Sequence, residues 1–127
     1  ALDKVNNDNK DMFDLMREIL KNDVSNVRYT DKLKDYPVSL SSIGDISIEM
    51  EKTLNAMPQT EKVSARKVLE INENHPISDK LKDLYKKDKE EFEKYTKLLY
   101  ATSREVCGLP MDNPNEFASI LCSILSK

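Results

Sequence analysis

The segment KVLEINENHP, residues 67–76, joins a strand pattern directly to a helix signal. Val68, Leu69 and Ile71 form a short apolar run of the kind found in buried strands. The polar residues that follow form a turn, and Pro76 suits the first position of a helix, because no backbone N–H is needed there. A buried strand followed at once by a helix indicates that both element types pack around one core.

Upstream of this segment, the spacing of apolar residues predicts two helices and two further strands. The helices span 9–21 and 46–57, where apolar residues recur every three or four positions. The strands span 24–30 and 38–42, where apolar and polar residues alternate. Residues 1–8 are mostly polar, and we expect them to be frayed.

Downstream, the sequence predicts three helices, the first of which starts at Pro76. The second spans 88–107, between a capping-box signal and Gly108, which suits a left-handed helix end. The third spans 113–126 and is apolar on more than one face, so we expect it to be buried on two sides.

These elements predict an α+β fold, with a small three-stranded sheet and a helical pair at the end of the chain. A length of 127 residues suits one domain, here 1–127. Within it we distinguish a sheet half, about 10–75, and a helical half, about 76–127.

Composition excludes several classes of function. The net charge of −3 and the absence of a basic stripe argue against nucleic-acid binding. No apolar run approaches the roughly 18 residues of a membrane span, and we expect no signal peptide and a cytoplasmic location. Two cysteines, Cys107 and Cys122, are too few for a disulfide framework, and two glycines exclude glycine-rich phosphate loops.

Candidates for catalysis are few. His75 is the only histidine and lies in a turn, where a turn or capping role is the more common one. Carboxylates interleave with lysines, which is typical of solvated helix faces. We therefore predict no catalytic, cofactor-binding or metal-ligating residue. The competing hypothesis, an enzyme or small-molecule-binding domain with His75 or Cys107 at its site, predicts a pocket around those residues.

The predicted helix over 46–57 carries a narrow apolar stripe, made of Ile46, Met50, Leu54 and Met57. Helical spacing of this kind is most often core packing. Methionine is also favoured where a surface must adapt to many partners. Both interpretations stay open from the pattern alone.

The last two helices carry more apolar surface than an antiparallel pair can bury. The helix over 88–107 has a heptad pattern, which is typical of helix pairing. A second copy of the same pair would complete a four-helix bundle, whereas the sheet half could cover the excess instead. The heptad positions are Phe92, Tyr95, Leu99, Thr102 and Val106.

Five segments occur in the order and at the spacing of a known family: KLKDYPV (32–38), GDISIEMEK (44–52), VLEINENHP (68–76), LLY (98–100) and PNEFA (114–118). Through them the chain resembles the C-terminal domain of the heat-shock protein 90 chaperones, of the bacterial type. The resemblance covers the chain from about residue 10 to its end.

The resemblance implies a homodimerisation module of an ATP-driven chaperone, in which the last two helices of each chain form an intermolecular four-helix bundle. It assigns nine residues to what we call the predicted interface. They are Leu98, Leu99, Thr102, Val106, Phe117, Ile120, Leu121, Ile124 and Leu125.

The resemblance also implies that Ile46, Met50 and Leu54 lie on a mobile amphipathic helix that contacts non-native client proteins, and Met57 extends this stripe. Thr53 is polar where some family members are apolar, which weakens the stripe there. The implied partners are thus a second copy of the chain and client proteins, with no nucleic acid and no membrane.

ATP and magnesium would bind the family's N-terminal domain, so we expect no ATP hydrolysis and no cofactor in this chain. The start at Ala1 without methionine fits a cut domain. The end at Lys127 lacks the acidic tail that recruits tetratricopeptide-repeat co-chaperones, as expected of a bacterial or organellar type. The alternative is a stand-alone, non-catalytic protein-interaction domain or, less favoured, a small-molecule-binding domain.

Overall fold

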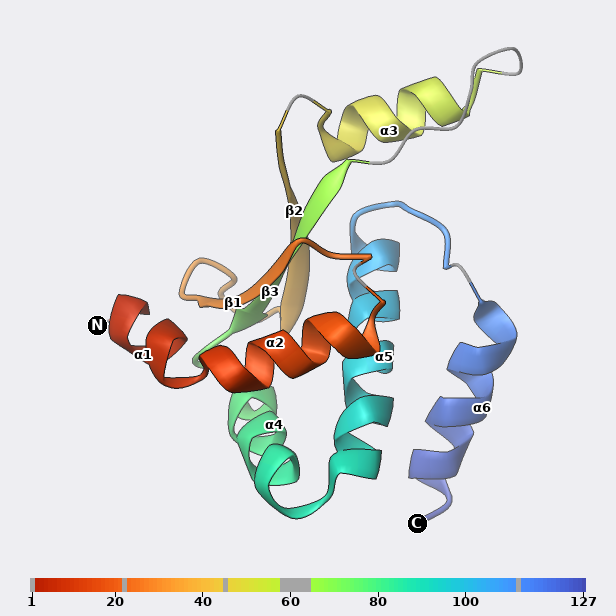
Figure 1. Cartoon of the computed structure of the whole chain (residues 1–127). Helices are drawn as coiled ribbons and strands as arrows, with labels where there is room; N and C mark the ends of the chain where they lie inside the picture. The colour runs from red at the N-terminus through yellow and green to blue at the C-terminus, as the bar shows by residue number, and fades with distance from the viewer. Residues whose placement is uncertain (1, 22, 45, 58–64, 112) are drawn as a thin grey trace.

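The computed structural model describes residues 2–21, 23–44, 46–57, 65–111 and 113–127. Over these ranges the chain forms six helices and a three-stranded sheet (Figure 1). The α+β class is confirmed, and so are the predicted strands. The elements are α1 (Leu2–Asp8), α2 (Lys10–Ile19), β1 (Asn26–Thr30), β2 (Val38–Ile43), α3 (Ile48–Asn55), β3 (Arg66–Asn72), α4 (Pro76–Lys87), α5 (Lys89–Val106) and α6 (Pro114–Leu125).

The strand in KVLEIN is the centre of the sheet, whose order is β1-β3-β2. β3 runs parallel to β1 and antiparallel to β2, so that Leu69 lies opposite both Val27 and Leu40. Leu69 and Ile71 are fully buried, as expected for a central strand that is covered by helices.

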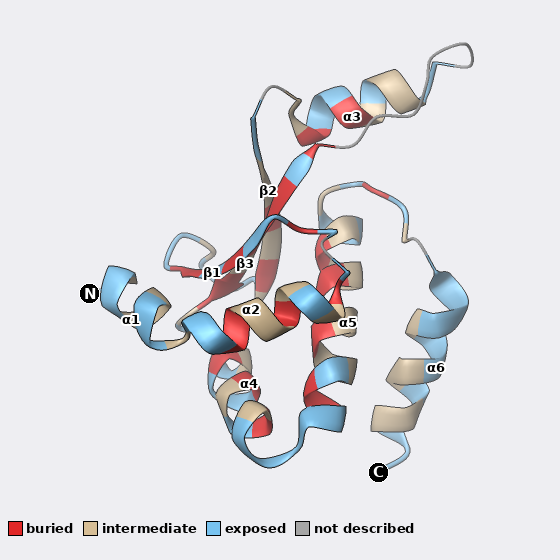
Figure 2. Cartoon of the chain, in the orientation of Figure 1, coloured by how far each residue is buried: buried red, intermediate tan, exposed pale blue. Residues whose placement is uncertain are grey.

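Helices cover the sheet from several sides: α2 packs on β1, α4 on β3 and α5 on β2. Figure 2 shows their buried residues on the sides that face the sheet and one another. The ring of Phe13 on α2 meets the ring of Tyr29 on β1 edge to face, with centroids 5.1 Å apart. Phe92 on α5 is fully buried, so α5 contributes directly to the core.

The prediction of a frayed N-terminus was wrong, because residues 2–8 form α1. Leu2 and Val5, three positions apart, pack against the core and give this short helix an apolar side. The side-chain oxygen of Asn6 accepts a hydrogen bond from the backbone N–H of Tyr29 over 2.7 Å. The helix therefore shields part of the outer edge of β1.

The helical end is less enclosed than its composition predicted. α6 lies beside α5, and the described chain buries none of its residues (Figure 2). The described chain alone therefore does not bury α6 on two sides, and the predicted burial would need a surface beyond this chain. None of the described helices has the length and apolar content needed to span a bilayer.

Candidate functional site

The α5–α6 hairpin carries apolar side chains that the described chain leaves partly uncovered. α6 begins at Pro114, after a cap in which the Asn113 side-chain oxygen accepts a hydrogen bond from the Glu116 N–H over 3.1 Å. The helix is amphipathic only weakly, since apolar residues occur around most of its circumference. Leu125, near its end, is 72% exposed.

The predicted interface residues divide into three groups. Val106 and Leu125 are exposed, and Leu99 is buried in the chain's own core. The remaining six are half-buried, and together with the exposed pair they leave apolar surface on both helices of the hairpin. These six are Leu98, Thr102, Phe117, Ile120, Leu121 and Ile124.

Not all heptad positions of α5 lie on the solvent-exposed side of the α5–α6 hairpin. Phe92 and Leu99 are heptad positions, yet both are buried in the core. The buried face of α5 also includes Thr96 and Ser103, which the pattern did not mark as core positions. A helix between a sheet and a second helix has two apolar faces, and a heptad count does not separate them.

A cleft of about 250 Å³ lies between the end of α2 and the α5–α6 hairpin. Leu98, Phe117 and Ile120 of the predicted interface line it, so this surface is concave there. Lys97 and Glu116, which also line the cleft, form an ion pair of 3.8 Å between the two helices. Neither His75 nor Cys107 is among its lining residues.

An ion pair joins the two helices at the end of the hairpin where α5 begins and α6 ends. The Glu91 carboxylate, at the start of α5, pairs with the ammonium groups of Lys127 and Lys94. The hydrogen bond from Lys127 is the main reason that the pKa of Glu91 is lowered from its ordinary value, and Lys94 adds to it. The same bond raises the pKa of Lys127. The C-terminus of the chain is thereby tied to the first turn of α5.

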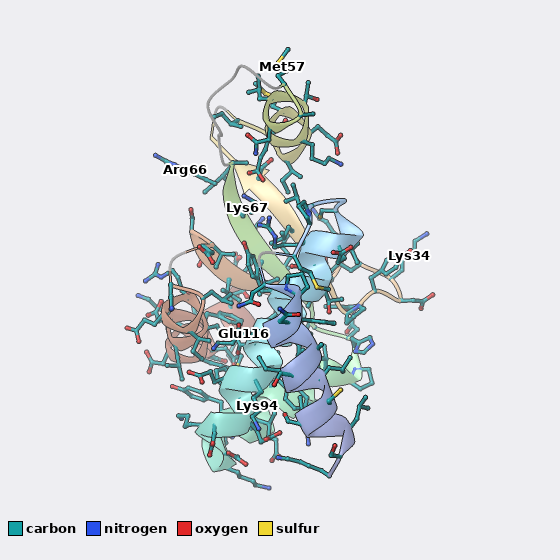
Figure 3. The ribbon with its side chains drawn as sticks, turned by 90° about the vertical axis from the view of Figure 1, so that its right-hand side faces the viewer. Lys34, Met57, Arg66, Lys67, Lys94 and Glu116 are labelled. Carbon is teal, nitrogen blue, oxygen red and sulfur yellow. The ribbon has the colours of Figure 1, made fainter. Side chains whose placement is uncertain are left out.

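The apolar stripe lies on α3 and the residues beside it. Met50 and Met57 are 46% and 50% exposed, whereas Ile46 and Leu54 are half-buried. Ile46 packs against the edge of the core, whereas the two methionines do not, so the core interpretation holds only for the start of the stripe. In Figure 3, Met57 lies at the tip of the molecule, far from the α5–α6 hairpin.

Sequence reasoning missed the buried side of α3, which is formed by Ile48 and Glu51. Glu51 forms an ion pair of 2.7 Å with Lys67 at the start of β3, and both side chains are nearly inaccessible to solvent. A signal for Lys67 was present in the sequence. Positions 67, 69 and 71 share one face of a strand, so Lys67 lies on the same face as two buried apolar residues.

The remaining candidates are His75 and the two cysteines. The Nδ1 of His75 accepts a hydrogen bond from the N–H of Ile77 over 3.0 Å and caps α4, which confirms the predicted capping role. The Cys107 thiol is half-buried, 3.5 Å from the carbonyl oxygen of Leu40, and Cys122 is exposed. The described residues include no group of three or more His, Cys, Asp or Glu side chains placed to hold a metal ion.

The sequence of this chain matches a known protein family. The family model described as Hsp90 protein matches residues 1–127. The chaperone protein HtpG of Clostridium perfringens (strain 13 / Type A) is 47% identical over 122 residues, which is 96% of this chain and 20% of that protein. HtpG of Natranaerobius thermophilus is 47% identical over 117 residues, 92% of this chain and 19% of that protein.

HtpG of Bacillus subtilis (strain 168) is 46% identical over 116 residues, which is 91% of this chain and 18% of that protein. The chain thus spans about a fifth of the length of these relatives. Since the family model covers every residue of the sequence, this chain belongs to the Hsp90 family.

Proposed function

We propose that this chain is a single-domain dimerisation module of an ATP-dependent chaperone, and that two copies pair through α5 and α6 in a four-helix bundle. The observation that supports this proposal is the state of α6. Seven of its twelve residues are apolar, yet the described chain buries none of them. A helix of this composition is stable in water only when another surface covers it.

The arrangement of the hairpin favours a second copy as that surface. An interface between two identical chains uses the same patch on both, so a continuous patch on two adjacent helices can pair with itself. Four helices packed in this way bury a shared apolar core. The predicted interface residues with exposed surface, from Leu98 to Leu125, form such a patch on the hairpin.

In a full-length chaperone of the kind to which the relatives belong, this pairing would hold two copies of the protein together. Two ATPase arms joined by a permanent dimer stay at high effective concentration, so their closure becomes an intramolecular step. ATP and magnesium would be held by other domains of that protein. In this proposal the chain acts in the cytoplasm, where Cys107 and Cys122, which form no disulfide with each other, stay reduced.

The second part of the proposal is that the apolar stripe binds non-native client proteins. Met50 and Met57 present flexible, polarisable side chains to solvent, and Met57 lies at the tip of the molecule (Figure 3). Thioethers adapt to apolar surfaces of many shapes, which suits partners without a common sequence.

Sedimentation of the chain, together with capture of a chemically unfolded probe protein, tests both parts. The dimer proposal predicts a single species of twice the chain mass, and the client proposal predicts that this species binds the unfolded probe and not its folded form. A monomer at all concentrations would contradict the first part. Equal binding of folded and unfolded probe would contradict the second.

A further inference from the structure

The apolar contacts of α3 are too few to explain why this helix has a fixed position. The helix has eight residues, and only one buried apolar side chain, that of Ile48. Helices this short do not form in water without tertiary contacts. A single buried isoleucine is a small anchor for a helix that exposes Glu49, Met50 and Thr53 to solvent.

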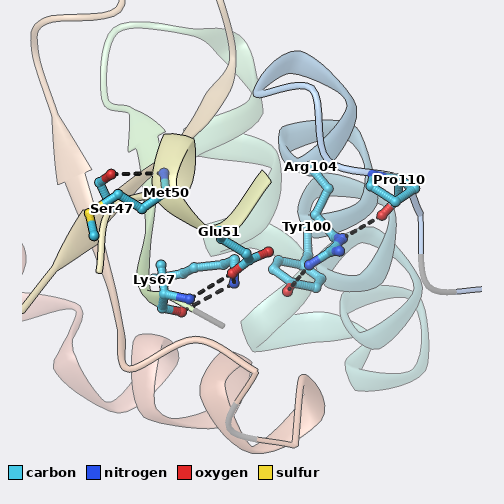
Figure 4. A network of polar contacts seen from close by, with 8 residues as sticks. Ser47, Met50, Glu51, Lys67, Tyr100, Arg104 and Pro110 are labelled. Atoms are coloured by element: carbon cyan, nitrogen blue, oxygen red, sulfur yellow. Dashed lines mark hydrogen bonds and ion pairs between the residues drawn. The ribbon is translucent and has the colours of Figure 1, made fainter. Parts of the chain in front are cut away.

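The remaining anchor is polar and buried. One carboxylate oxygen of Glu51, Oε1, accepts hydrogen bonds from the backbone N–H of Ala65 over 2.6 Å and from Lys67 Nζ over 2.7 Å. The Lys67 ammonium also donates to the Ala65 carbonyl oxygen over 3.1 Å. Figure 4 shows the contact between Glu51 and Lys67. Each of the two residues is only 4% exposed. The carboxylate therefore ties α3 to the first residues of β3.

A second polar contact joins α3 to α5. Lys52 Nζ donates to the carbonyl oxygen of Cys107 over 3.0 Å, at the C-terminal end of α5, and pairs with Glu49 at 2.8 Å. Cations are favoured at this end of a helix. Two adjacent residues of α3 thus hold the helix: Glu51 binds Lys67 on β3, and Lys52 binds the end of α5.

These contacts determine which side of α3 faces solvent. Successive residues of an α-helix are rotated by about 100°. Met50 is thus rotated by about 100° from Glu51, and the same spacing continued past the end of α3 places Met57, seven residues after Met50, within about 20° of Met50. When Glu51 points inward, both methionines point outward, as their exposure shows.

We propose that the buried Glu51–Lys67 pair is a positioning device, which fixes the rotation of α3 and so keeps Met50 and Met57 presented to client proteins. This inference rests on the proposed client-binding role of the stripe. It differs from the picture of a freely mobile helix, because the root of α3 is held by a buried charge pair and its outer face alone is free to adapt.

The test compares Glu51→Ala with Glu49→Ala as the matched control. Glu49 lies on the same helix, its side chain is 81% exposed, and its pairing is on the surface. Both variants remove one carboxylate and introduce the best helix former, so lost helix propensity does not explain a difference between them. Each is measured by amide hydrogen exchange of α3, by light scattering, and by capture of reduced, carboxymethylated α-lactalbumin as the unfolded probe.

For Glu51→Ala we expect exchange in α3 to rise by on the order of tenfold over Glu49→Ala, with unchanged protection in β3 and α5. Capture of the probe falls several-fold and the mass in solution does not change. If Lys67 without its partner prevents folding, the neutral double variant Glu51→Gln with Lys67→Met replaces Glu51→Ala, since an uncharged pair leaves no buried lone charge.

Two results would overturn the inference: exchange in α3 that is the same in both variants, or exchange that rises while capture stays at the level of the control. The proposed client role fails separately. If the unchanged chain captures no probe, the stripe does not bind clients, and the exchange data alone then decide whether the pair positions α3.

Discussion

Lys52 on α3 and Cys107 at the end of α5 meet through one hydrogen bond, in which the ammonium donates to the backbone carbonyl oxygen over 3.0 Å. The next residue, Gly108, has a positive φ of 82° and ends the helix in the left-handed region. A Cβ atom at Gly108 would lie 3.1 Å from Lys52 Nζ. The glycine thus serves two purposes: it permits the turn and leaves room for the lysine.

Gly108→Ala should destabilise the chain by about 1–2 kcal/mol for its backbone conformation alone, and by a further amount for the displaced lysine. Gly44→Ala is the matched control, because Gly44 also has a positive φ, of 87°, but the nearest neighbour of its added Cβ among the described residues, Arg66 Cδ, would lie at an ordinary 3.7 Å. Urea unfolding measures both. Equal losses in the two variants would show that the Lys52 contact adds nothing.

Leu121→Glu should dissociate the proposed dimer, because each chain would place an unpaired carboxylate in an apolar interface. Ser119→Glu is the control: Ser119 is exposed, two residues away, and therefore on nearly the opposite side of α6. Light scattering of both variants should show a monomer for Leu121→Glu and a dimer for Ser119→Glu. An unchanged dimer mass for Leu121→Glu would place the interface elsewhere.

Met50→Asp combined with Leu54→Asp should weaken capture of an unfolded probe protein several-fold, because charged groups resist transfer to apolar client surfaces. Helical circular dichroism and mass in solution should stay unchanged, since Met50 is 46% exposed and Leu54 only half-buried. Loss of the folded state in this variant would mean that the stripe supports the core of the domain.

The Glu91–Lys127 pair should make the end of the hairpin sensitive to pH. The pKa of Glu91 is lowered from 4.5, mainly by the hydrogen bond from Lys127, so its contribution to stability is present above pH 4.5 and disappears as the pH falls through the lowered value. The pKa of Lys127 is raised from 10.5 by the same bond, so the pair also weakens as the pH rises beyond 10.5.

Amide exchange in the last turn of α6, followed from pH 7 down to pH 3 and corrected for intrinsic exchange rates, measures the acid side of this effect. Protection should fall below pH 4.5 in the unchanged chain, and Glu91→Gln should already lack it at pH 7. A Glu91→Gln variant with the protection of the unchanged chain at pH 7 would show that the pair does not hold the C-terminus.

Local apolar spacing was sufficient to predict most elements of the fold. The three strands and the helices from α2 onward follow alternation or three-to-four spacing, which depends only on neighbouring residues. The order of the strands did not follow from spacing, because β3 lies between two strands that precede it in the chain. α1 was missed because its apolar side consists of only two residues, Leu2 and Val5.

Local sequence features also predicted part of the candidate site. The composition of α6 indicated a helix that needs a second surface, and the structure leaves that helix without a buried residue. Leu99 was assigned to the predicted interface but lies in the core, since a heptad pattern does not say which neighbour a face meets. The buried pair of Glu51 and Lys67 required the fold itself, because 15 other residues of the chain separate them.

Pairing of two chains through the α5–α6 hairpin is tested most directly by the molar mass of the unchanged chain in solution, measured by light scattering over a dilution series. The predicted result is a mass near 29.2 kDa, twice the 14.6 kDa of one chain, that persists on dilution. A mass of 14.6 kDa at every concentration would contradict dimerisation by this domain alone.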